Sequence, residues 1–151
     1  MITEEKNLLL KDLSARLPYG VKCVTPNGIH PLTKIDIDYV NGSLLVFNDN
    51  KLYSLPLLQY LSEVKPCLFP LSSMTENQKK EFNNLTTSIE LDSSEIGSAI
   101  AYNMDIDINE YSYISLEDMI TCIDWLNSHH FDYRGLIEKG LAIDATGLNI
   151  Y

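Results

Sequence analysis

The stretch that most constrains the fold covers residues 33–57 and reads TKIDIDYVNGSLLVFNDNKLYSLPL. In it Ile35 and Ile37 alternate with Asp36 and Asp38, which is typical of a strand with one solvent-exposed face. The dipeptide NG that follows is the preferred two-residue hairpin turn, because both of its positions need positive φ. SLLVF and KLYSL then read as further strands separated by NDN. Together with an earlier strand in VKCVT, the pattern predicts a small antiparallel meander or open barrel.

Helices are predicted before and after these strands in the sequence. Leu9, Leu13 and Leu17 recur at every fourth position of residues 3–17, and Pro18 should end that helix. Thr75 with Gln78 forms a capping box, which predicts a short helix over residues 76–85.

The last helix should begin at Ser115, a good N-cap, and end near Ser128. Its expected apolar stripe consists of Leu116, Met119, Ile120, Ile123 and Leu126.

Two segments are harder to assign. Pro66 and Pro70 should confine any strand in residues 58–75 to an edge. Residues 86–114 fit both helix and strand, and at least one strand is expected there.

The fold class predicted from these elements is α+β. An N-terminal helix and a small antiparallel sheet would be joined by C-terminal helices packed on the sheet. A chain of 151 residues is about the size of one domain, and no convincing linker interrupts it. We therefore expect a single globular domain over residues 1–151.

Negative charge is concentrated in the second half of the chain. Residues 1–75 are neutral overall, and residues 76–151 carry the entire net charge of −10. Such a surface disfavours nucleic acid and suits a basic protein partner. The candidate partner surface consists of Glu90, Asp92, Glu95, Asp105, Asp107, Glu110, Glu117 and Asp118. A solvated acidic surface that only keeps the protein in solution is the simpler alternative.

The cellular compartment is predicted from three further features of the sequence. The N-terminus MITEEKNLLLKDL does not look like a signal peptide, and no apolar run is long enough to span a membrane. Cys23, Cys67 and Cys122 stand far apart, which predicts reduced and mostly buried thiols. A cytoplasmic location is expected, without membrane association.

The densest group of reactive side chains lies in NSHHFDYRG, where His130, Asp132, Tyr133 and Arg134 are candidates for a pocket. A catalytic or ligand-binding site there is one alternative. The other is a docking turn after the last helix, with Arg134 paired to a carboxylate such as Asp132. The second is favoured, because no nucleophile motif or metal-ligand spacing occurs nearby. No catalytic residue, cofactor or metal is therefore predicted.

Three blocks of the chain resemble short hypothetical proteins of gut Bacteroidales and of their phages and mobile elements. They are ARLPYGVKC (15–23), VKPCLFPLSSMTENQKKEF (64–82) and WLNSHHFDYRGLIEKGLAIDATGLNIY (125–151). The resemblance implies an accessory protein of mobile-element context and brings no activity, fold or site residue.

The leading functional hypothesis is a non-enzymatic interaction protein that binds a protein partner through its acidic half. Its rival is a small enzyme or ligand-binding domain with a site at His130, Asp132, Tyr133 and Arg134. A third hypothesis, nucleic-acid binding through Lys22, Lys34 and Lys51, ranks lower because these bases are few and scattered. The oligomeric state has no signal in the sequence.

Overall fold

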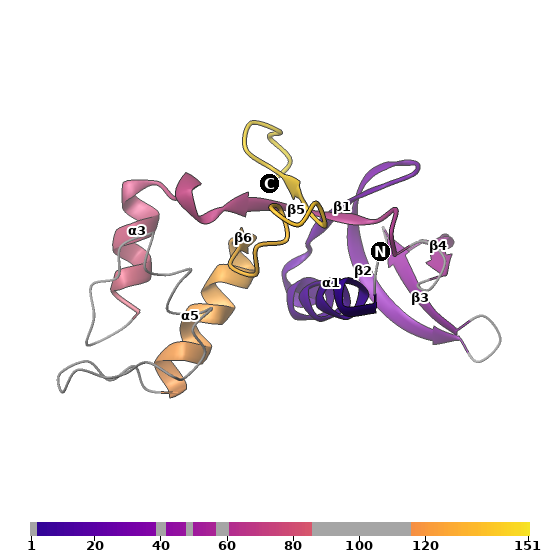
Figure 1. Ribbon diagram of the computed structural model, residues 1–151, viewed down its shortest axis with the longest axis horizontal. Helices are drawn as coiled ribbons and strands as arrows, with labels where there is room; N and C mark the ends of the chain where they lie inside the picture. Colours follow the sequence, from indigo (N-terminus) through magenta and orange to yellow (C-terminus); the bar gives the residue numbers. More distant parts are fainter. Residues whose placement is uncertain (1–2, 39–41, 48–49, 57–60, 86–115) are drawn as a thin grey trace. The chain divides into compact units, whose positions relative to one another are not determined.

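The chain folds into two compact units, drawn in Figure 1. The computed structural model describes residues 3–38, 42–47, 50–56, 61–85 and 116–151. The first unit comprises Met1–Leu68 and Leu136–Tyr151, and the second comprises Phe69–Gly135. The first unit is therefore discontinuous in sequence, because the second is inserted into it.

The first unit begins with helix α1 (Thr3–Arg16), followed by the short 3-10 helix η1 (Leu17–Tyr19). The α-helix ends two residues before Pro18, close to the predicted end, since proline lies near the start of η1. Gly20 terminates η1 with φ of 67°, a left-handed conformation that favours glycine. Its N–H donates to the carbonyl of Leu17.

The sheet of the first unit is an antiparallel meander with additions. Its strands are β1 (Lys22–Thr25), β2 (Gly28–Asp38), β3 (Gly42–Phe47), β4 (Asn50–Pro56), β5 (Lys65–Pro70) and β7 (Ile143–Asp144). The order is β4-β3-β2-β1-β5, each neighbouring pair is antiparallel, and β7 pairs with β5 in parallel. The predicted meander and its extra N-terminal strand are confirmed, whereas Asn41 of the predicted NG turn lies outside the described residues.

Strand β5 corrects the expectation that its prolines confine it to an edge. It pairs with β1 through Lys65 and Pro66, and with β7 through Cys67 and Leu68. In the second unit its last two residues pair in parallel with β6 (Phe131–Asp132). Each pairing covers only two residues of β5, so the strand tolerates two residues that lack a backbone N–H.

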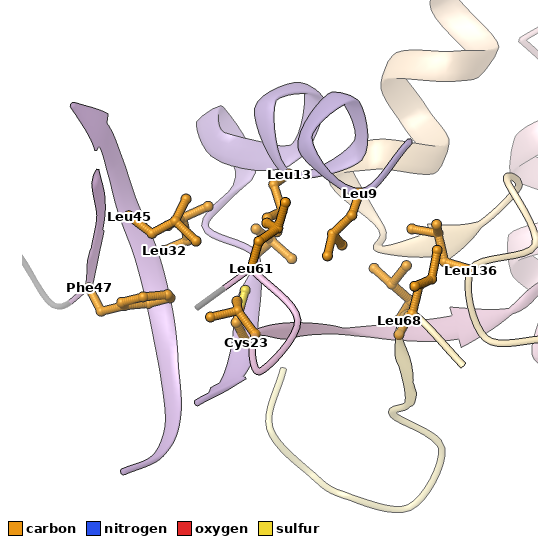
Figure 2. Close-up of a cluster of buried hydrophobic side chains, with 13 residues drawn as sticks. Leu9, Leu13, Cys23, Leu32, Leu45, Phe47, Leu61, Leu68 and Leu136 are labelled. Carbon is orange, nitrogen blue, oxygen red and sulfur yellow. The ribbon is translucent and has the colours of Figure 1, made fainter. Parts of the chain in front are cut away.

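The core of the first unit lies between α1 and the sheet. Figure 2 shows Leu9 and Leu13 extending from α1 toward the strands. Cys23 of β1 is fully buried there. The cluster consists of Leu9, Leu13, Val21, Cys23, Leu32, Leu45, Phe47, Leu61, Val64, Leu68, Leu136, Leu141 and Ala142. Residues from both sequence parts of the unit thus share one core.

A salt bridge is buried in α1 beside this core. Arg16 Nε donates to Asp12 Oδ2 at 2.9 Å, and both side chains are 0% exposed. Burying two charges costs several kcal/mol per ion, roughly, unless the pair and its hydrogen bonds offset the lost hydration. The two residues therefore depend on each other.

The second unit holds two packed helices and a core of its own. Its helices are α3 (Glu76–Asn83) and α5 (Leu116–Ser128), preceded by the 3-10 helix η2 (Leu71–Ser73). Thr75 caps α3 in a capping box with Gln78, as predicted. The core consists of Met74, Phe82, Cys122, Trp125, Leu126, Phe131 and Tyr133.

Helix α5 has the predicted end, and its predicted buried face is confirmed only in part. Leu116 and Ile120 were expected in the core, yet they are 69% and 52% exposed. Leu126 of the predicted stripe is buried, and Cys122 and Trp125 join it on the buried face. Trp125 is larger than any residue of the predicted stripe, and its burial decides how the helix is turned.

The predicted α+β class is confirmed. The sheet is open and rich in antiparallel pairs, so the closed form of a barrel is not adopted by the described strands. The expectation of one globular domain stays a prediction. Residues 86–114, which the sequence left between helix and strand, lie outside the described residues.

Candidate functional site

The predicted pocket residues follow the C-terminus of α5 in a tight turn. The N–H of His129 donates to the carbonyl of Trp125 at 3.0 Å, and that of His130 donates to the carbonyl of Asn127 at 3.2 Å. His130 then adopts φ of 59°, in the left-handed region. A left-handed residue at this position ends a helix, and glycine usually occupies it.

The turn leads directly into strand β6, which joins the sheet of the second unit. The N–H of Phe69 in β5 donates to the carbonyl of His130 at 2.9 Å, and Phe131 is the register partner of Phe69. Their rings lie 6.2 Å apart, at an angle of 55°. His130 and Asp132 are buried on either side of Phe131. The backbone thus docks this segment onto β5.

Tyr133 and Arg134 are brought together by a hydrogen bond. Arg134 Nη2 donates to the Tyr133 hydroxyl at 2.9 Å, and its guanidinium lies 4.9 Å from the centre of the Tyr133 ring. The same hydroxyl donates to Asn127 Oδ1 at 3.1 Å. Asn127 is 2% exposed and was missed by the sequence reasoning, because a single asparagine at a helix end carries no distinctive signal.

His129 is held against the indole of Trp125. The two rings are stacked with centroids 4.0 Å apart, and His129 Nδ1 lies 2.9 Å from the carbonyl oxygen of Trp125. Because a carbonyl oxygen can only accept, Nδ1 carries the proton in this contact. Trp125 Nε1 donates to Glu81 Oε1 of α3 at 3.1 Å. These contacts fix the end of helix α5.

The chemistry of this turn is that of a packed structural element. The Tyr133 hydroxyl bonds to Asn127 and Arg134 within the second unit, and the expected pairing of Arg134 with a carboxylate stays a prediction. Within the described ranges, no group of three or more His, Cys, Asp or Glu side chains could hold a metal ion. Burial raises the pKa of Cys122, and the charge of Asp118 raises it further, so this thiol is a poor nucleophile.

The backbone of His130 gives a direct test of its structural role. His130→Ala should destabilise the protein, because alanine keeps the left-handed strain and loses the buried ring. His130→Gly should be more stable than His130→Ala by about 1 kcal/mol, since glycine adopts this conformation without strain. Urea unfolding followed by circular dichroism measures the difference. Equal stability of the two variants would contradict a left-handed turn at this position.

The predicted acidic surface is described only in part. Glu90, Asp92, Glu95, Asp105, Asp107 and Glu110 lie outside the described residues. Glu117 is exposed and Asp118 is half-buried, both in the first turn of α5. One helical face also carries Thr121 and Asp124, which are exposed together with Leu116 and Ile120. Acidic and apolar side chains are therefore interleaved along one surface.

Comparison with known proteins does not extend these assignments. No protein-family model, curated protein or solved structure matches the chain. Among the described residues, no helix is both long and apolar enough to cross a membrane.

Proposed function

We propose that the protein is a non-enzymatic accessory protein that binds a basic protein partner through the exposed face of α5. The observation that carries this proposal is the exposure of Leu116 and Ile120 beside Glu117 and Asp124. Large exposed apolar side chains rimmed by charges are typical of protein interaction surfaces. We call these residues, with Thr121, the α5 face; Asp118, in the same first turn, adjoins it.

The spacing of the residues in the α5 face supports a partner whose surface is both basic and apolar. Residues 116, 117, 120, 121 and 124 recur at intervals that keep them on one side of a helix. Its carboxylates would pair with lysine or arginine side chains, and its two apolar residues would pack against an apolar neighbour. A basic surface with apolar residues between its charges fits both requirements.

The cellular setting is part of the same proposal. The resemblance to short proteins of Bacteroidales, phages and mobile elements supports an accessory role in such an element. Cys23, Cys67 and Cys122 are free and buried, which suits the reducing cytoplasm. A basic host or element-encoded protein, including one that itself binds nucleic acid, is the proposed partner.

The test compares two triple variants of equal charge. Glu117→Gln with Asp118→Asn and Asp124→Asn neutralises the α5 face and the adjoining Asp118. Glu4→Gln with Glu63→Gln and Glu138→Gln removes three exposed acids from the first unit. Each set changes the net charge of −10 by the same amount. Each variant is used for affinity capture from a Bacteroidales lysate at low salt, followed by elution in a salt gradient and mass spectrometry.

We expect a basic protein that elutes at moderate salt from the wild type and from the first-unit variant. The α5 variant should bind it about tenfold more weakly, because its charge pairs are lost. Equal loss in both variants would mean nonspecific attraction to negative charge. Unchanged binding in the α5 variant would overturn the assignment of this face.

A further inference from the structure

The seam between β1 and β5 in the first unit is closed by a side chain. The register pairs Cys23 with Pro66 and Val24 with Lys65, so one further step places Lys22 opposite Cys67. In a regular antiparallel ladder every second pair of opposed residues bonds directly, backbone to backbone. Lys22 and Cys67 are joined by a side chain. Here the Tyr151 hydroxyl stands between them: it accepts from the Lys22 N–H at 2.9 Å and donates to the Cys67 carbonyl at 2.9 Å.

Lys22 holds the same segment through its side chain. Its ammonium donates to the carbonyl of Ile150 and lies 5.5 Å from the centre of the Tyr151 ring. Burial raises the pKa of Tyr151, so the hydroxyl keeps the proton that it donates to Cys67. Tyr151 itself remains 44% exposed, although its hydroxyl is inserted at the seam. The contact is therefore both specific and accessible from solvent.

We propose that residues 146–151 form a releasable strap over the β1–β5 seam, latched by the Tyr151 hydroxyl and the Lys22 ammonium. Release of the strap withdraws the hydroxyl and uncovers the Lys22 N–H and the Cys67 carbonyl. Uncovered backbone groups at an open seam are unfavourable, which keeps the strap closed in the isolated protein. The strap thus acts as a conformational device that opens one seam of the sheet without unfolding the rest.

The different locations of the three cysteines distinguish this opening from unfolding. The Cys67 thiol lies at the seam: burial raises its pKa, whereas the backbone of Val24 and the charge of Lys22 lower it. Cys23 belongs to the core between α1 and the sheet. Cys122 belongs to the core of the second unit. Opening of the strap should therefore expose Cys67 alone, and global unfolding should expose all three.

The experiment is timed alkylation of the protein of residues 1–151 with N-ethylmaleimide, read for each cysteine by peptide mass spectrometry. Tyr151→Phe should label at Cys67 about tenfold faster than the wild type, because the bridging hydroxyl is lost. Lys22→Met, which keeps the apolar stem and removes the ammonium, should act in the same direction. Cys23 and Cys122 should label at the wild-type rate in both variants.

Tyr19→Phe is the matched control, since it removes another tyrosine hydroxyl from the first unit. It should leave the labelling rate of Cys67 unchanged. Acceleration at all three cysteines in Tyr151→Phe would indicate general destabilisation and overturn the strap. An unchanged rate at Cys67 in both strap variants would show that the seam is closed by other contacts, which also overturns it.

Discussion

Asp12→Ala should lower the free energy of unfolding by about 3–5 kcal/mol, the cost typical of leaving one member of a buried ion pair without its partner. The Arg16 guanidinium would keep its charge, because arginine does not deprotonate in proteins. It is 0% exposed and lies beside the core of the first unit. A loss of this size is a large part of the stability of a small protein. Chemical denaturation followed by circular dichroism measures it.

Two further variants test whether the loss of stability comes from the burial of the Asp12–Arg16 pair. The double variant Asp12→Leu with Arg16→Met should recover more than half of the loss, since apolar residues of similar size often replace a buried pair at little cost. Lys79→Ala breaks the exposed Glu76–Lys79 pair on α3 and should change the unfolding midpoint little. Similar losses from Asp12→Ala and Lys79→Ala would contradict the dependence on burial.

Trp125→Ala should lower the stability of the second unit by about 3–5 kcal/mol, the range for replacing a buried aromatic residue with alanine. The indole packs edge-on against Phe82 at 5.3 Å and is stacked with Phe131 at 5.7 Å. Its Nε1 also donates to Glu81. Removal of this ring would detach α5 from both α3 and β6. Ile120→Ala, on the exposed face of the same helix, is the matched control and should have little effect.

Thiol labelling locates this loss within the chain, which is useful because Trp125 is the single tryptophan and its fluorescence disappears with it. In Trp125→Ala, Cys122 of the second unit should become reactive at a lower urea concentration than in the wild type. Cys23 should keep its protection, because its cluster consists of residues of the first unit. Simultaneous loss of protection at both cysteines would mean that the two units unfold together.

The elements that were predictable from the sequence are those specified by near neighbours. The alternation at Ile35 and Ile37, the leucine spacing of α1 and the Thr75–Gln78 capping box each act over a few residues. They indicate the correct element without knowledge of the rest of the chain. The α+β class follows from the order of these elements alone.

What the sequence did not predict depends on partners distant in the chain. The pairing of β5 with β6 and β7 joins residues more than sixty positions apart, and no periodicity encodes it. The rotation of α5 is decided by the contacts of Trp125 with Phe82 and Phe131. The Tyr151 bridge to Lys22 and Cys67 likewise forms only when distant segments meet.

In the candidate site, too, the position in the chain was predictable and the side-chain contacts were not. The sequence placed His130, Asp132, Tyr133 and Arg134 at a turn after the last helix, where the structure has them. It did not include Asn127, whose side chain accepts from Tyr133, because that contact depends on the path of the turn. Asp124, which shares the exposed side of α5 with Glu117, was likewise absent from the predicted surface.

The insertion of Phe69–Gly135 into the first unit has a consequence for synthesis on the ribosome. Leu136, Leu141 and Ala142 belong to the core of the first unit, and β7 adds to its sheet. These residues are translated only after the whole inserted unit has been made. Helix α1 and the meander therefore cannot complete their core while the inserted unit is being made. The inserted unit has all its residues earlier and can fold first. Although translation of the first unit starts before that of the inserted unit, the first unit completes its folding last.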